Sequence, residues 1–384
     1  MTFDTSLFAS KLSRYRAQFQ LDVDDFVRLT GIKSDRVCAL EAGEVKPTGD
    51  EVLILADVFK CDYRFFISSE RVAPFEETEE LFRRHGNALT REDRWAIQEF
   101  LHLCECEAFL LDVLGRHPSV APFVYVPKDK YFKRDGANAA KALRAHLGLE
   151  TRQDITDVFD LLRRLGLRVF RRSLQNSEVS GLFVRHPIAG LCILVNYSED
   201  VYRQRFTAAH EACHAFLDTD QGFVVSFESG SSKWSRDDLV EIRANAFAGQ
   251  LLLPDDLVSE LPKVTWTLDN VTTFANKVRV NPVTLMFRLS DLNLIDEATI
   301  KNLRRSVKIP IEAKVDPEIG TGLTPLQAER KLRLLRLGLS AHYVGLCFDA
   351  LQEGHVSKGR VAEMMLCDER ELQGVAALFG RVLS

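Results

Sequence analysis

The stretch FTAAHEACHAFL, residues 206–217, decides the architecture of the functional part of this chain. On a helix, His210 and His214 are four positions apart and project from one face, so their ring nitrogens can converge on a metal ion. Glu211 projects about 100° away around the axis and can serve as the general base of a His-Glu-x-x-His motif. The opposite face is apolar and is expected to pack into a core; it carries Phe206, Ala209, Cys213, Phe216 and Leu217.

A catalytic zinc ion needs three protein ligands and one open position, so a third ligand must follow the motif. Residues 241–254 have the pattern of a second amphipathic helix, and Glu241 is expected in its first turn. An alternative role for Glu241 is a solvated carboxylate, which the helix dipole favours at a helix start. Spacing alone leaves both roles open.

Several blocks of this region resemble the ImmA/IrrE family of bacterial zinc metallopeptidases: residues 193–196, 203–207, 210–214, 241–248 and 251–254. The resemblance extends over about residues 120–300. It implies one Zn²⁺ ion per chain, bound by His210, His214 and Glu241, with Glu211 as the catalytic base. It also implies a substrate, a repressor-type protein of the Xre family, whose cleavage switches on stress, mobile-element or phage-defence genes. Cys213 departs from the small or aliphatic residue usual in the family.

Two apolar, β-branched runs precede the motif, at residues 179–185 and 191–196. The intervening residues His-Pro-Ile-Ala-Gly are typical of a turn, so the pair predicts a β-hairpin. A strand beside the motif helix could pair with an extended substrate backbone, which gives affinity without demanding a particular sequence.

Residues 1–70 predict a separate module of short helices that is similar to the Xre/Cro-like helix-turn-helix family. The resemblance implies DNA binding through Lys33, Ser34 and Arg36. The charge of the module opposes this function, because nine Lys and Arg face twelve Asp and Glu and an acidic surface repels phosphates. The alternative is that the module docks on another Xre-type protein, or on its own twin in a homodimer.

Residues 71–118 predict a helical linker that ends at a Gly-Arg-His-Pro breaker. It contains Cys104 and Cys106, which are too close together for an ordinary zinc pair and are expected to be reduced thiols on a helix. A second hypothesis is that one of these thiols occupies the open position of the zinc ion and blocks the catalytic water.

Residues 301–384 predict a C-terminal helical segment. Thr324 is a typical helix cap and Pro325 a typical first helical residue. The segment has thirteen basic and ten acidic residues. Such a charge run is usually a solvated face, but the segment could also sense an anion or a nucleic acid.

The whole sequence predicts a mainly helical α+β protein: a helix-turn-helix domain (1–70), a linker (71–118), a zincin-like peptidase domain with a small sheet (119–300) and the C-terminal segment (301–384). A net charge of −5 argues against a general polyanion binder. The first residues do not have the pattern of an export signal, and no stretch predicts a membrane span, so a cytoplasmic protein is expected. The competing function is a DNA-binding regulator whose metal domain senses a signal without proteolysis.

Overall fold

The computed structural model describes residues 3–61, 63–68, 89–128, 131–218, 223–227, 236–262 and 264–383. Residues 71–88 of the predicted linker lie outside this range, as do residues 69 and 70 of the predicted first domain. The chain divides into two compact units, Met1–Leu103 and Cys104–Ser384, and the division falls within helix α7 (Arg91–Val113). The domain boundaries at 70, 118 and 300 stay predictions.

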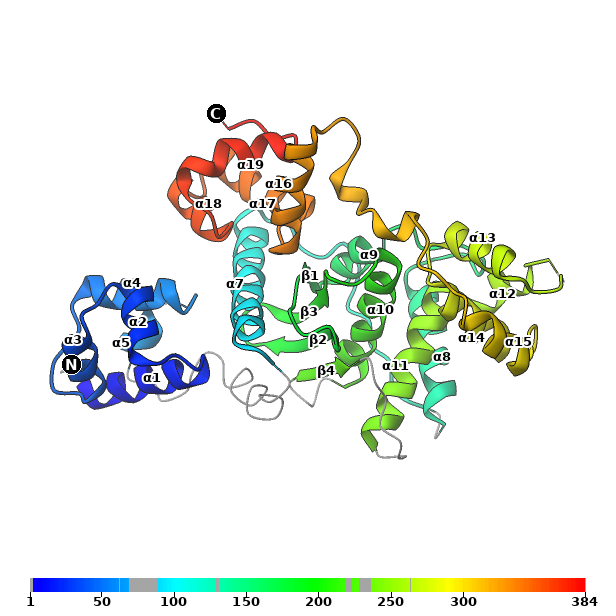
Figure 1. Ribbon diagram of the computed structural model, residues 1–384, viewed down its shortest axis with the longest axis horizontal. Helices are drawn as coiled ribbons and strands as arrows, with labels where there is room; N and C mark the ends of the chain where they lie inside the picture. The colour runs from blue at the N-terminus through cyan, green and yellow to red at the C-terminus, as the bar shows by residue number, and fades with distance from the viewer. Residues whose placement is uncertain are drawn as a thin grey trace. The chain divides into compact units, whose positions relative to one another are not determined.

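The first unit is a small helical bundle (Figure 1). Gly31 ends α2 with a positive φ of 68°, a conformation that a residue without a Cβ adopts at little cost. Three residues separate the end of α2 from the start of α3. The core is largely aromatic, and Trp95 of α7 stacks on Phe19 with ring centroids 4.2 Å apart. The short helices predicted between residues 7 and 67 are confirmed as α1 (Thr5–Gln18), α2 (Val23–Thr30), α3 (Ser34–Glu41), α4 (Gly49–Val58) and α5 (Arg64–Ile67).

The second unit is built around a four-stranded mixed sheet with the strand order β1-β3-β2-β4. The predicted hairpin is confirmed: β2 and β3 pair antiparallel, with His186 opposite Gly190. β1 pairs parallel with β3, and β4 pairs antiparallel with β2. No described strand pairs with the other edge of β4. The strands are β1 (Arg168–Arg172), β2 (Val179–His186), β3 (Gly190–Asn196) and β4 (Phe223–Phe227).

One face of the sheet is covered by the helix that carries the motif, α10 (Val201–Leu217), and α11 (Arg236–Leu252) packs against α10 (Figure 1). Alanines of α10 pack with Phe183 of β2 and Ile193 of β3 in one buried core, which explains the apolar spacing of the motif. The other helices of this region are α8 (Phe132–His146), α9 (Val158–Arg164), α12 (Asp255–Ser259), α13 (Leu268–Val278), α14 (Pro282–Asp291) and α15 (Glu297–Arg304).

The C-terminal segment is helical, as expected, and it packs on the sheet face opposite α10. Phe170 of β1 contacts Tyr343 edge-on at 5.3 Å between ring centroids. The predicted cap is confirmed, because Thr324 and Gln327 form a reciprocal capping box around Pro325. The elements are η2 (Glu312–Lys314), η3 (Pro317–Ile319), α16 (Pro325–Arg336), α17 (Ala341–Gln352), α18 (Lys358–Met364), η4 (Glu369–Glu371) and α19 (Leu372–Leu378).

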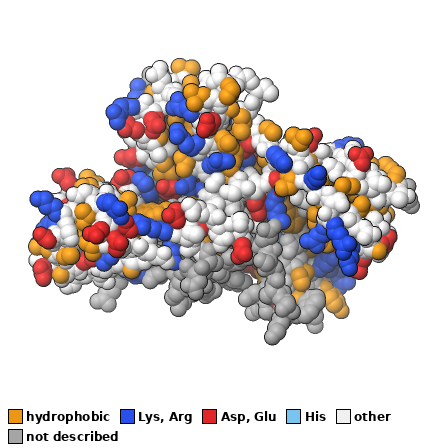
Figure 2. All heavy atoms as spheres, in the orientation of Figure 1, with side chains coloured by type: hydrophobic (Ala, Val, Ile, Leu, Met, Phe, Trp, Pro, Cys, Tyr) orange, Lys and Arg blue, Asp and Glu red, His pale blue; other side chains and the backbone are white. Residues whose placement is uncertain are grey.

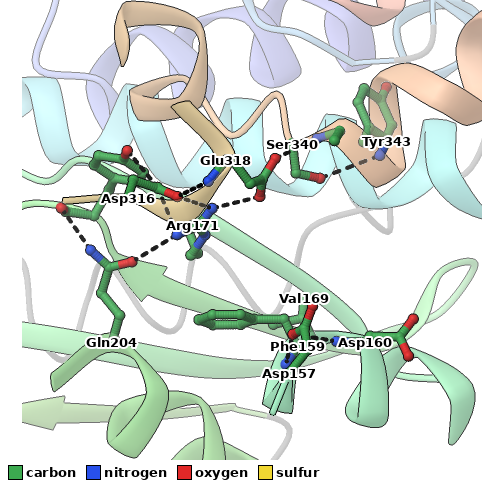
Figure 3. A network of polar contacts seen from close by, with 12 residues as sticks. Asp157, Phe159, Asp160, Val169, Arg171, Gln204, Asp316, Glu318, Ser340 and Tyr343 are labelled. Atoms are coloured by element: carbon green, nitrogen blue, oxygen red, sulfur yellow. Dashed lines mark hydrogen bonds and ion pairs between the residues drawn. The ribbon is translucent and has the colours of Figure 1, made fainter. Parts of the chain in front are cut away.

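A buried polar network joins this segment to the sheet (Figure 3). Arg171 of β1, only 6 % exposed, pairs with Asp316 at 2.8 Å and with Glu318 at 2.6 Å. It also donates a 3.3 Å hydrogen bond to Gln204 of α10, and Tyr197 donates one to Asp316 at 2.6 Å. The network therefore connects the C-terminal segment to the first turns of the motif helix.

The fold is mainly helical with one small mixed sheet, which confirms the predicted α+β class. Among the described residues, no single helix has the length and apolar character needed to cross a bilayer; only α16 and α17 taken together, bent by 89°, pass that test.

Candidate metal centre

The structure brings His210, His214 and Glu241 together, with one ligand atom from each lying within 4.8 Å of the other two. The Nε2 atom of His210 lies 3.1 Å from that of His214 and 3.1 Å from Oε2 of Glu241. The distance from His214 Nε2 to Glu241 Oε1 is 3.4 Å. Two imidazoles and one carboxylate form the donor set that zinc takes in catalytic sites, so these residues fit that ion.

Glu241 lies in the second turn of α11, which corrects the expectation that it begins the helix. The helix starts at Arg236, because the polar run before Glu241 continues the helical pattern and Val240 is buried. Helical residues therefore both precede and follow Glu241, so Glu241 is not a solvated carboxylate at the start of a helix. Since α10 and α11 pack against each other, their adjoining faces bring the three donors together.

Two hydrogen bonds fix the orientation of the histidine rings. His214 Nδ1 lies 2.9 Å from Oδ2 of Asp218, whose other oxygen accepts from Arg243. His210 Nδ1 lies 3.2 Å from Oδ1 of Asn245. These contacts at Nδ1 leave the Nε2 atom of each ring facing Glu241, the side on which a metal ion would bind, and partners of this kind are how metal-binding histidines are oriented.

The charges of the cluster are strongly coupled. Burial alone would lower the pKa of His214, but its hydrogen bonds to Asp218 and Glu241 outweigh burial and raise the pKa to about 10. Burial alone would raise the pKa of Glu241, but the hydrogen bonds from the two histidines hold it far below its usual range. The arrangement thus favours a positive charge between these donors, which a divalent cation would supply.

Glu211 lies beside this cluster in a fully buried position. Neither oxygen of its carboxylate has a hydrogen-bond partner among the described residues, and burial raises its pKa. Leaving a carboxylate unpaired in the protein interior is costly, so such a group usually serves a ligand or a reaction. A water molecule beside Glu211 would satisfy it.

Gly181 makes room for this carboxylate, a role that the sequence did not reveal. A Cβ atom at position 181 of β2 would lie 3.0 Å from Oε1 of Glu211 and 2.7 Å from Cγ2 of Thr207. Ser226 of β4 is opposite Gly181 in the sheet register, and its buried hydroxyl lies close enough to Glu211 to act against the rise in the pKa of that carboxyl, although it makes no hydrogen bond of ordinary geometry among the described residues. Both residues belong to the sheet face that packs on α10.

The sequence signals for the other residues of the site were uneven. Asp218 follows His214 at a four-residue spacing on the same helix face, so helical periodicity could have found it. Asn245 lies in the block that carried the family resemblance, four residues after Glu241. Gly181 and Ser226 come from strands whose register with the helix no local pattern predicts.

Neither Cys104 nor Cys106 belongs to the cluster. Cys104 contacts Cys192 of β3, and because side chains alternate along a strand, Cys192 faces away from Ile193 and the α10 core. The sheet therefore separates Cys104 from the histidines. Cys106 lies near Tyr343, and burial raises its pKa to about 12, so its thiol stays protonated. The hypothesis of a zinc-blocking thiol gains no geometric support.

The residues proposed to face DNA differ in their surroundings. Lys33 and Ser34 are exposed, whereas the guanidinium of Arg36 is held by Glu51 at 2.7 and 2.9 Å and by the carbonyl oxygen of Lys46 at 2.7 Å. Acidic and basic side chains are interspersed over the helices of the first unit (Figure 2). DNA binding by this unit stays a prediction, and Arg36 is not available for it in this arrangement.

Residues 162–290 match the family model of the IrrE N-terminal-like domain, a domain of peptidase family M78. The matched range begins in α9, contains the whole sheet, α10 and α11, and ends in α14. No curated protein matches the chain. The family is one of zinc proteases, so the match indicates a metallopeptidase-like function for this part of the second unit.

Proposed function

We propose that the second unit is a zinc-dependent endopeptidase with His210, His214 and Glu241 as ligands and Glu211 as the catalytic base. The observation that carries this proposal is the fully buried, unpartnered carboxylate of Glu211 beside three converging donor atoms. A merely structural metal site is closed by a fourth protein ligand and has no use for such a base.

When bound, zinc would act as a Lewis acid that polarises the scissile carbonyl and makes a water molecule more acidic. Glu211 takes the proton of the attacking water, and the raised pKa of this carboxylate helps it to hold that proton. It then passes the proton to the nitrogen of the departing amine. Glu211 is fully buried beside Gly181 of β2, which keeps bulk water away from the transferred proton.

The edge of β4 that pairs with no described strand is the proposed binding surface for the substrate backbone. β4 is an outer strand of the sheet, and its residue Ser226 is opposite Gly181, which lies against Glu211. An extended peptide could add to this edge by main-chain hydrogen bonds, which explains how the enzyme could bind a protein segment without strict sequence demand. By the resemblance stated above, we propose an Xre-family repressor as the substrate.

The proposal is tested with the purified full-length chain, its zinc content and candidate repressor proteins. We expect one zinc ion per chain and cleavage that stops when the metal is chelated and returns when zinc is restored. Glu211→Gln should keep the zinc and lose the cleavage. A Glu211→Gln protein that cleaves like the natural sequence would overturn the role of Glu211, and a protein that binds no zinc would overturn the metal centre.

A further inference from the structure

A second, cationic pocket lies in the second unit, beside β1, which is an outer strand of the sheet. It has a volume of about 350 Å³ and is bordered by the C-terminal end of α7, by α9 and β1, and by α17 of the C-terminal segment. Five arginines line it against three carboxylates, Glu107, Asp160 and Asp349; the arginines are Arg116, Arg163, Arg164, Arg168 and Arg381. The pocket therefore has an excess of positive charge.

The carboxylates do not neutralise this charge. Asp349 is shared by Arg116 at 2.8 Å and Arg381 at 2.7 Å, so one negative charge faces two positive ones. Glu107 is paired with His342 at 3.2 Å instead of with an arginine. The arginines that line the pocket therefore outnumber the carboxylates that the chain places beside them.

The arginines on the α9 and β1 side have few partners. Arg164 and Arg168 make no side-chain hydrogen bond or ion pair among the described residues, and the Nε atom of Arg168 is buried without a partner. Arg163 donates to the carbonyl oxygen of Val169 at 3.0 Å, but its Nε atom is likewise buried and unpaired. Buried guanidinium N–H groups without acceptors are costly, which points to an acceptor supplied by a ligand.

The N-terminal end of α17 borders the pocket, but its first backbone N–H group is not left open for an anion. The first backbone N–H of α17, at Ala341, already donates to Glu318 at 2.6 Å. The guanidinium groups are therefore the groups left to bind an anion. Gly345 of α17 permits this geometry, because a Cβ there would lie 2.7 Å from Nη2 of Arg381.

We infer that this pocket binds a small phosphate-bearing metabolite, up to the size of a mononucleotide. Guanidinium groups match phosphate oxygens with paired N–H donors. The volume lies at the lower end of small-molecule sites, and Leu111, Pro118 and Leu346 provide an apolar wall for an organic moiety. Since the lining comes from both the sheet region and the C-terminal segment, the ligand would tie the two together. The inference is independent of the peptidase activity.

The test is calorimetric titration of the full-length chain with ADP and with inorganic pyrophosphate, at constant ionic strength. We expect saturable binding of at least one probe at one site per chain, and a rise in Tm of several degrees at saturation. Arg168→Gln and Arg164→Gln should each weaken binding at least ten-fold by the loss of a charge-assisted hydrogen bond. Because these side chains have no protein partner, neither change should lower the Tm of the unliganded protein.

Arg185→Gln is the matched control, since Arg185 is an exposed strand arginine outside the pocket. Binding should be unchanged in this variant. Two results would overturn the inference: no saturable binding of either probe at millimolar concentration, or equal weakening by the control and the pocket variants. Arg164 is exposed, so its variant stays informative even if Arg168→Gln impairs folding.

Discussion

A Cβ atom at Gly181 would lie 3.0 Å from Oε1 of Glu211, so the strand and the motif helix touch where the proposed base is seated. Glu211 can occupy this position only because residue 181 of the neighbouring strand has no side chain.

Gly181→Ala should therefore displace Glu211 or separate α10 from β2. The extra methyl also meets Thr207 and the carbonyl oxygen of Leu194, and overpacking of this kind costs about 1–3 kcal/mol. We expect peptidase activity to fall at least ten-fold and Tm to fall as well. Gly49→Ala is the control, because a Cβ at Gly49 meets nothing within 4 Å. Full activity of Gly181→Ala would show that the carboxylate does not depend on this contact.

Asp218→Asn should weaken zinc binding. The substitution removes the charge that orients His214 and leaves Arg243 without its buried ionic partner. Partners of metal-binding histidines typically contribute roughly 10–100-fold in metal affinity, so we expect a loss of that size in a competition with a chelator. Asp57→Asn changes an exposed aspartate of α4 and should leave the affinity as it is. Equal affinity of both variants would argue that Asp218 has no orienting role.

The stability of the first unit should depend on Glu51 in acid. The hydrogen bond from Arg36 lowers the pKa of Glu51 from 4.5 to about 2. A carboxyl whose pKa is lower in the folded state stabilises the fold above pH 4.5, and this contribution is lost as the pH falls towards 2. Glu51→Gln should thus be less stable than the natural sequence in urea unfolding at neutral pH. The difference should shrink as the solution is acidified; a constant difference would contradict the pairing.

Cysteine reactivity should follow burial. Cys38 is exposed, whereas Cys104 and Cys106 are buried and burial raises the pKa of each. With iodoacetamide at neutral pH, we expect Cys38 to be labelled in the native protein. Cys104 and Cys106 should be labelled only after unfolding, as measured by peptide mass spectrometry. Rapid native labelling of Cys104 would reopen the hypothesis of a regulatory thiol.

Local patterns were sufficient to predict the elements that form the metal cluster. The spacing of His210 and His214, the hairpin and the cap at Thr324 each depend on a few neighbouring residues, and the structure contains all of them. The start of α11 was misplaced by a turn because polar residues continue a helix as readily as they precede one.

Features that depend on residues far apart in the sequence could not be predicted from local patterns. Gly181 matters only because β2 packs on α10, and the arginine pocket forms only because α17 lies beside β1. The position of Cys104 behind the sheet likewise follows from strand register rather than from its spacing to Cys106. Tertiary packing decides these relationships, and a single sequence carries no periodic signal for it.

The network around Arg171 has a practical consequence for anyone who wishes to isolate the proposed peptidase domain. Cutting the chain at residue 300 would delete Asp316 and Glu318 and strand a guanidinium that is only 6 % exposed. Removing the partner of a buried charge typically costs about 3–5 kcal/mol, a large share of the stability of an ordinary domain. Such a truncated protein should aggregate on expression, whereas one that retains residues 301–384 keeps both carboxylate partners of Arg171.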